Sequence, residues 1–160
     1  MLSMKNYRLA VDENGSPFVL NSKGSIDFGY ITEEMNLPAA PIRVAEGLTG
    51  PKGYGLKHIA ERHEKEIINV GYNSVYDFVE DVANDFTEIK EGKNGSFLLE
   101  KGDAYHNTLF VALSREGDYW KVISGEYSGP DIQKIKRYSI LPPKCGHLLL
   151  LKMIFCQMKI

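Results

Sequence analysis

The sequence predicts an α+β domain, with two main helices packed on an antiparallel β-sheet and an N-terminal hairpin. Apolar residues recur with helical spacing in two segments between residues 56 and 86, and the segments after residue 86 alternate with a period of two. An Asn-Gly turn also lies between two short apolar runs near the start. The chain has 160 residues, 43% hydrophobic and 25% charged, which fits a single domain over residues 1–160.

Residues 1–50 are expected to form the hairpin and a proline-rich connector. The turn ENGS separates the runs YRLAV and FVL, an arrangement typical of a β-hairpin. Thr32 can cap a short helix in which Glu33 and Glu34 occupy the first turn, where the helix dipole favours acids. Pro38 and Pro41 then end this helix and predict an extended connector.

Residues 51–140 are expected to form the core of the domain, beginning with helices over residues 56–70 and 74–86. Gly71 is expected to end the first helix, and either Asn73 or Ser74 to cap the second. Asp77 lies three residues after Ser74, as in a capping box. The predicted buried stripe of the first helix, with spacings of 4, 3, 4 and 3, is Leu56, Ala60, His63, Ile67 and Val70. The predicted stripe of the second is Val75, Phe78, Val79, Val82 and Phe86.

Four strands are predicted after residue 86, with tight turns at KNGS and EG. Their sequences are FTEIKEG, SFLLEKG, NTLFVALSRE and DYWKVISGEY. In the last strand, alternation places Trp120, Val122 and Ser124 on one face and Lys121 on the other, unless Gly125 marks a β-bulge. Trp120 is expected in the core.

Residues 141–160 form a tail to which no role is assigned. Its run HLLLLKMIF has nine residues, well short of the roughly 20 that a membrane-spanning helix needs, so a buried strand or short helix is expected and no membrane partner. Cys145 and Cys156 match no zinc or redox spacing. The net charge of −2 means that any nucleic-acid site must be a local patch of cations.

The segment GYGLKHIAERH contains two of the four histidines, His58 and His63. Five residues of helix correspond to about 500°, so the two side chains point roughly 140° apart and cannot form the paired-histidine zinc site of a metalloprotease. His58, beside Lys57 and Arg62, is either part of a solvated polar face or an imidazole next to a phosphate-binding pair of cations. His63 is either a core histidine bonded to a backbone carbonyl or a site residue.

A longer pattern favours the site interpretation. The run LPAAPIRVAEGLTGPKGYGLKHIAERH follows GSIDFGYIT and precedes a second helix and the strands. Residues 25–128 thereby resemble phage- and polymorphic-toxin nucleases of the barnase–EndoU–colicin–RelE superfamily. The match rests on Leu-Pro-x-x-Pro-Ile-Arg followed by Gly-x-Gly-x-x-His-Ile-x-x-x-His.

The resemblance implies a metal-independent endoribonuclease toxin that cleaves RNA, with tRNA the expected substrate, by attack of a ribose 2′-OH on the adjacent phosphate. It implies no metal and no cofactor. The catalytic residues it implies are His58, His63 and Ser124. The substrate-binding residues are Arg62, Lys121 and Tyr127, for which ordinary surface positions are the alternative.

The same resemblance implies a place of action and a partner. The enzyme would act in the cytoplasm of its target cell, which it would reach as part of a secreted protein, as in contact-dependent inhibition, or as part of a phage protein. A cognate immunity protein would be its partner. The alternative function is a catalytically inactive phage or toxin-associated binding module with the same fold.

Overall fold

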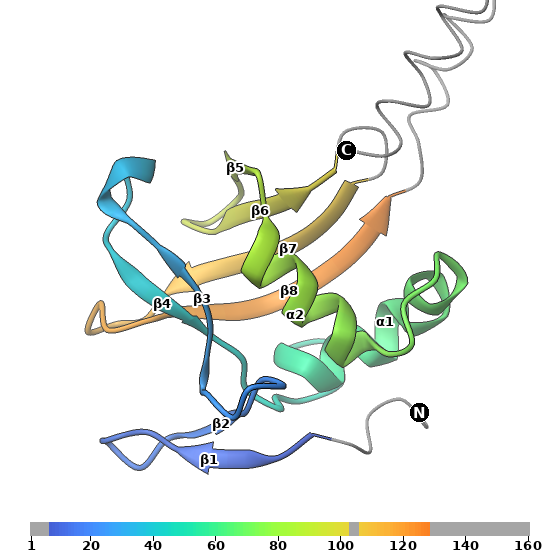
Figure 1. Ribbon diagram of the computed structural model, residues 1–160, viewed down its shortest axis with the longest axis horizontal. Coiled ribbons are helices and arrows are strands. Elements are labelled where there is room, and N and C mark those ends of the chain that lie inside the picture. Colours follow the sequence, from blue (N-terminus) through green and yellow to red (C-terminus); the bar gives the residue numbers. More distant parts are fainter. Residues whose placement is uncertain (1–6, 103–105, 129–160) are drawn as a thin grey trace, which may run out of the picture.

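The computed structural model describes residues 7–102 and 106–128, and the fold within them is α+β, as predicted (Figure 1). The tail over residues 141–160, with both cysteines, lies outside the described residues. The strands are β1 (Leu9–Val11), β2 (Pro17–Val19), β3 (Asp27–Ile31), β4 (Ala40–Arg43), β5 (Glu88–Glu91), β6 (Phe97–Lys101), β7 (His106–Leu113) and β8 (Trp120–Ser128). The helices are the 3₁₀ turn η2 (Glu33–Met35), α1 (Gly55–Asn69) and α2 (Val75–Asp85).

The main sheet has six strands in the order β3-β4-β8-β7-β6-β5, and it is mixed rather than antiparallel. The four predicted strands form the antiparallel meander β5 to β8. The predicted connector is itself a strand, β4, which pairs antiparallel with β3 and parallel with β8. Ile42 lies opposite Trp120, and both side chains are buried. The connector therefore joins the sheet through a core contact with a strand far along the chain.

The hairpin of β1 and β2 forms a separate two-stranded sheet, as the ENGS turn predicts. The N–H of Val19 donates to the carbonyl of Val44 at 2.7 Å, which attaches β2 to the segment that follows β4. The buried Arg43 adds a second attachment. Its Nε donates to Asp27 at 2.8 Å, and its Nη1 lies 3.6 Å from the carboxylate of Asp12 in the hairpin turn.

Both main helices pack on one face of the large sheet, and Figure 1 shows α2 crossing in front of β7 and β8. The buried residues of α1 are Gly55, Leu56, Ile59, Ala60 and Ile67. The stripe therefore includes Ile59, which contacts β8, and His63 and Val70 lie at its edge, with exposed fractions of 23% for the His63 side chain and 38% for Val70. The prediction that both belong to the stripe was wrong.

The ends of the helices mostly follow the sequence prediction. Gly71, at φ 114°, follows the C-cap of α1, and Ser74 is the N-cap of α2, its Oγ accepting the N–H of Asp77 at 3.0 Å. The stripe of α2 is confirmed, with Phe86 partly buried at its end. The helix predicted after Thr32 is only the single turn η2, because Asn36 adopts a left-handed conformation and Pro38 follows.

The β-bulge in β8 lies at Ile123 and not at Gly125. Phe110 pairs with Ser124, but the next residue, Val111, pairs with Val122. The extra residue reverses the alternation beyond it. Gly125 therefore faces the helices, on the same side of the sheet as the buried Trp120 and Val122. A Cβ added at Gly125 would lie 3.3 Å from Ile59 of α1 and 3.1 Å from Phe78 of α2.

Candidate active site

The start of α1 is attached to the loop over residues 47–54. No side chain caps this helix; instead the N–H groups of Leu56 and Lys57 donate to the carbonyls of Ala45 and Glu46 at 3.0 and 2.8 Å. A Cβ at Gly47 would lie 1.7 Å from the carbonyl oxygen of Tyr54, so only glycine fits there. Two of the N-terminal donors of α1 are thus satisfied by backbone carbonyls.

The same loop folds back over the first turns of α1. Leu48 and Tyr54 form an antiparallel bridge, and the N–H of Gly53 donates to the carbonyl of Gly50 at 2.9 Å. One turn along the helix, the carboxylate of Glu61 accepts the N–H of Gly50 at 3.0 Å. The loop is therefore fixed to α1 at both its base and its tip.

His58 lies under this loop and is not part of a fully solvated polar face. Its Nδ1 is buried and has no hydrogen-bond partner among the described residues. A Cβ built on Gly53 would lie 2.7 Å from this nitrogen, so the loop packs directly on the imidazole. An imidazolium ring would need a partner for the N–H at Nδ1, and the buried position supplies none. The local structure therefore favours the neutral ring.

The charges around His58 act in both directions on its pKa. Burial lowers the pKa from the ordinary value of 6.5, and the positive charge of Arg62 lowers it further. Glu61 raises the pKa and His63 lowers it. The net result is a pKa below 6.5, so His58 is a proton acceptor at neutral pH.

His63 lies one turn further along α1 and is not a core histidine. Its Nδ1 lies 3.4 Å from both carboxylate oxygens of Glu66, and its side chain is 23% exposed. From the sequence, both a core role and a site role were open for His63. Its exposure and its contact with an exposed glutamate favour a position accessible to a ligand.

Lys121 is held near the same loop by an aromatic ring. Its ammonium lies 4.5 Å from the centre of the Tyr54 ring, in a cation–π contact. Lys121 follows Trp120 in β8 and lies opposite Arg43 in the parallel pairing with β4. Tyr54 therefore links the two predicted parts of the site, since it immediately precedes α1 and also contacts β8.

The structure does not bring Ser124 to His58. Pairing is regular from Ser124 to Ser128, so Ser124 faces away from Gly125 and from the helices that Gly125 contacts. Tyr127 lies on the helix side, opposite Asn107, and packs partly buried against the core. The predicted catalytic group therefore divides into the residues of α1 and Ser124, which lies on the face of β8 turned away from the helices; Lys121 contacts the segment before α1 through the Tyr54 ring.

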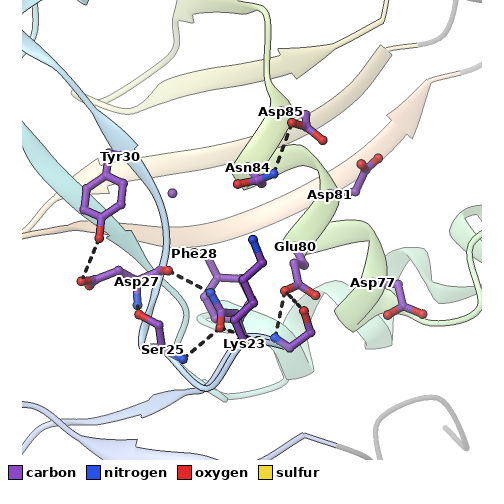
Figure 2. A pocket seen from close by; sticks show the side chains of 13 residues that line it. Lys23, Ser25, Asp27, Phe28, Tyr30, Asp77, Glu80, Asp81, Asn84 and Asp85 are labelled. Carbon is purple, nitrogen blue, oxygen red and sulfur yellow. Dashed lines mark hydrogen bonds between the residues drawn. The ribbon is translucent and has the colours of Figure 1, made fainter.

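Two hollows differ in charge. The larger, about 530 Å³, lies between α2 on one side and the β2–β3 loop with strand β3 on the other (Figure 2). Apart from Lys23, its charged side chains are acidic: Asp27, Asp77, Glu80, Asp81 and Asp85. The smaller, about 350 Å³, contains Tyr54 and Lys121. The first hollow therefore repels anions, whereas the second contains one cation, Lys121, and one carboxylate, Glu46.

No cluster of three or more His, Cys, Asp or Glu side chains able to hold a metal ion is formed by residues 7–102 and 106–128. No helix in the same part of the chain is long and apolar enough to cross a membrane. Comparison with protein-family models, with curated proteins and with solved structures finds no match.

Three side chains around the smaller hollow were not predicted from the sequence. They are Glu46 and Tyr54, from the segment between β4 and α1, and Tyr119, which immediately precedes β8. Tyr54 had a local signal, because it stands in the glycine-rich segment GPKGYG directly before the helix. Glu46 and Tyr119 had none, since only the pairing of β4 with β8 brings their segments together.

Proposed function

We propose that this protein is a metal-independent endoribonuclease in which His58 is the general base. The observation that carries the proposal is a half-buried histidine with a lowered pKa in the first turn of α1, next to Arg62. A general base must be deprotonated at the working pH and must lie beside groups that hold the substrate. His58 meets both requirements, and the motif around it resembles that of toxin ribonucleases.

The reaction uses the substrate's own hydroxyl. His58 takes the proton from a ribose 2′-OH, the oxygen attacks the adjacent phosphorus, and the bond to the 5′ oxygen breaks. His63, partly exposed on the same helix, is the candidate that returns a proton to the leaving oxygen. The products carry a 2′,3′-cyclic phosphate and a 5′-hydroxyl. Because a proton is taken by one group and given by another, the rate should depend on pH with a bell shape.

Cations near the loop are suited to the phosphate. Lys57 and Arg62 are both exposed on α1, on either side of His58 in the sequence. A guanidinium binds two phosphate oxygens at once and stabilises the charge that develops on them. Lys121 approaches from β8 through Tyr54. We therefore assign phosphate binding to these cations rather than to Ser124.

The test is cleavage of total tRNA by the purified full chain in EDTA, followed by end-group analysis. Wild type should yield cyclic-phosphate ends, and a substrate with 2′-deoxy nucleotides should be inert. His58→Ala should abolish cleavage with the melting temperature nearly unchanged. Lys65→Ala, an exposed cation on the same helix, is the matched control and should cleave normally. Products with 5′-phosphate ends, or full activity of His58→Ala, would refute the proposal.

One observation favours the alternative, a binding module that has kept the fold without the activity. Ser124 faces away from the helices, so the three residues predicted to be catalytic do not converge. If Ser124 were needed for catalysis, the wild-type chain would bind tRNA and leave it intact. In the proposed enzyme, Ser124→Ala should retain most of the wild-type rate. Toxin delivery and an immunity partner belong to the same proposal and follow from the resemblance alone.

A further inference from the structure

The hollow beside Lys121 has the composition of a small ligand site. Its volume is about 350 Å³, at the lower end of the range for pockets that bind small molecules. The floor and walls come from three segments: the β1–β2 hairpin, the β4–α1 loop and the start of β8. Its aromatic and charged side chains are Phe18, Glu46, Tyr54, Tyr119 and Lys121.

The aromatic walls are fixed before any ligand binds. Tyr119 meets Phe18 edge-to-face with ring centres 5.0 Å apart, and the guanidinium of Arg43 lies 5.6 Å from the centre of the Tyr119 ring. Arg43 is itself fixed by the carboxylate of Asp27. The backbone of Tyr54 is held by its bridge to Leu48, and its ring contacts the ammonium of Lys121. Rigid aromatic surfaces lose little entropy when a flat ring stacks on them.

The two charged groups of the pocket set opposite requirements for a ligand. The carboxylate of Glu46 accepts a hydrogen bond from the hydroxyl of Tyr7, which orients it. The ammonium of Lys121 makes no ion pair with the described residues and lies 4.5 Å from the centre of the Tyr54 ring. A carboxylate accepts hydrogen bonds and an ammonium only donates them. A ligand that fits is therefore flat and carries both an N–H donor and an acceptor.

We propose that this pocket binds one nucleobase of the RNA, and that it selects a base with an exocyclic amino group. The amino group of adenine, cytosine or guanine can donate to Glu46, and a carbonyl or ring nitrogen of the same base accepts from Lys121. Uracil has no exocyclic amino group. Its ring donor, N3–H, lies between two carbonyl oxygens, and the carboxylate repels these oxygens when N3–H donates to Glu46. Tyr54 lines the pocket, and the neighbouring Gly53 packs on His58, so the loop that contains both residues connects the pocket to the proposed general base.

This inference deepens the proposed function, but binding can be measured without cleavage. The four nucleoside 3′-monophosphates are titrated into the full chain, followed by calorimetry and by NMR shifts. We expect the three amino-bearing nucleotides to bind about tenfold more tightly than uridine 3′-monophosphate, because the Glu46 carboxylate repels the uracil oxygens; this is on the order of one hydrogen bond to a charged group.

Glu46→Gln is the decisive variant, because an amide can donate to a uracil carbonyl while its oxygen still accepts from Tyr7. In this variant, the affinity for the amino-bearing nucleotides divided by that for uridine 3′-monophosphate should fall to about one. Glu33→Gln, an exposed carboxylate in η2, should keep the wild-type preference. Tyr54→Leu should weaken the binding of all four nucleotides by roughly tenfold, through loss of stacking. Thermal melts check that each variant is folded.

The outcomes separate the two proposals. If all four nucleotides bind equally, or if Glu46→Gln keeps the preference, the pocket proposal is wrong even when tRNA is cleaved. If the preference and its loss are observed but no RNA is cleaved, the pocket is supported and the nuclease proposal is wrong.

Discussion

Replacing Gly53 with alanine perturbs His58 without touching its chemistry. A Cβ at this position would lie 2.5 Å from the carbonyl oxygen of Leu48, 2.7 Å from Nδ1 of His58 and 2.9 Å from the carbonyl oxygen of Gly50. All three distances are shorter than contacts that real Cβ atoms make. Two of the atoms belong to the backbone of a loop fixed by Glu61, so the imidazole ring has to move.

The size of the effect follows from these contacts. Inserting a methyl group into a tightly packed site costs about 1–3 kcal/mol, because neighbouring groups are forced from their preferred positions. For a domain of this size, a loss of about 2 kcal/mol lowers the melting temperature by roughly 7 °C. A displacement of the imidazole by about 1 Å should reduce the cleavage rate on the order of 100-fold.

Urea denaturation and tRNA cleavage measure the two effects separately. Thr49→Ala is the control, since Thr49 is exposed in the same loop and carries no charge. Its stability should stay within about 0.5 kcal/mol of wild type. A Gly53→Ala variant with wild-type stability would refute the packing of the loop on His58. A variant that is destabilised but cleaves at the wild-type rate would refute the catalytic role of His58.

Three further predictions concern pH and packing. Arg62 lowers the pKa of His58 and Glu61 raises it. Arg62→Gln should therefore move the acidic limb of the pH–rate profile to higher pH, and Glu61→Gln should move it to lower pH. Shifts of both variants in the same direction would contradict the assignment of His58 as the base. Because the folded-state pKa of His58 lies below 6.5, the unfolded chain binds its proton first as the pH falls, and stability measured in urea should decrease below about pH 6.5. His58→Ala should show a smaller decrease. Gly29→Ala would place a Cβ 2.1 Å from the backbone oxygen of Ala83 and separate β3 from α2, so the free energy of unfolding should fall by at least about 3 kcal/mol. Tyr30 is 58% exposed, so Tyr30→Ala should change the free energy of unfolding little.

Local sequence patterns determined most of the secondary structure. The four strands after residue 86 appear where the period of two predicts them, and the stripe of α2 is buried as predicted. Ser74 caps α2 because its hydroxyl is the right distance from the N–H of Asp77, a relation within three residues. These features depend on neighbours in the chain, so the sequence alone contains the information.

The position of β4 was decided by the tertiary structure. Its segment contains Pro41 and follows Pro38, so local rules predict a connector. It becomes a strand because Ile42 packs opposite Trp120, and the indole N–H donates to the carbonyl of Pro38 at 3.0 Å. No local pattern encodes a pairing between segments so far apart in the chain.

The composition of the candidate site was also decided in three dimensions. The sequence placed the histidines on one helix, but the burial of His58 depends on a loop that returns over it at Gly53. A single extra residue at Ile123 turns Ser124 to the opposite face of the sheet. Side-chain direction in a strand has a period of two, so one inserted residue reverses every later position, and only the pairing with β7 shows where the insertion lies.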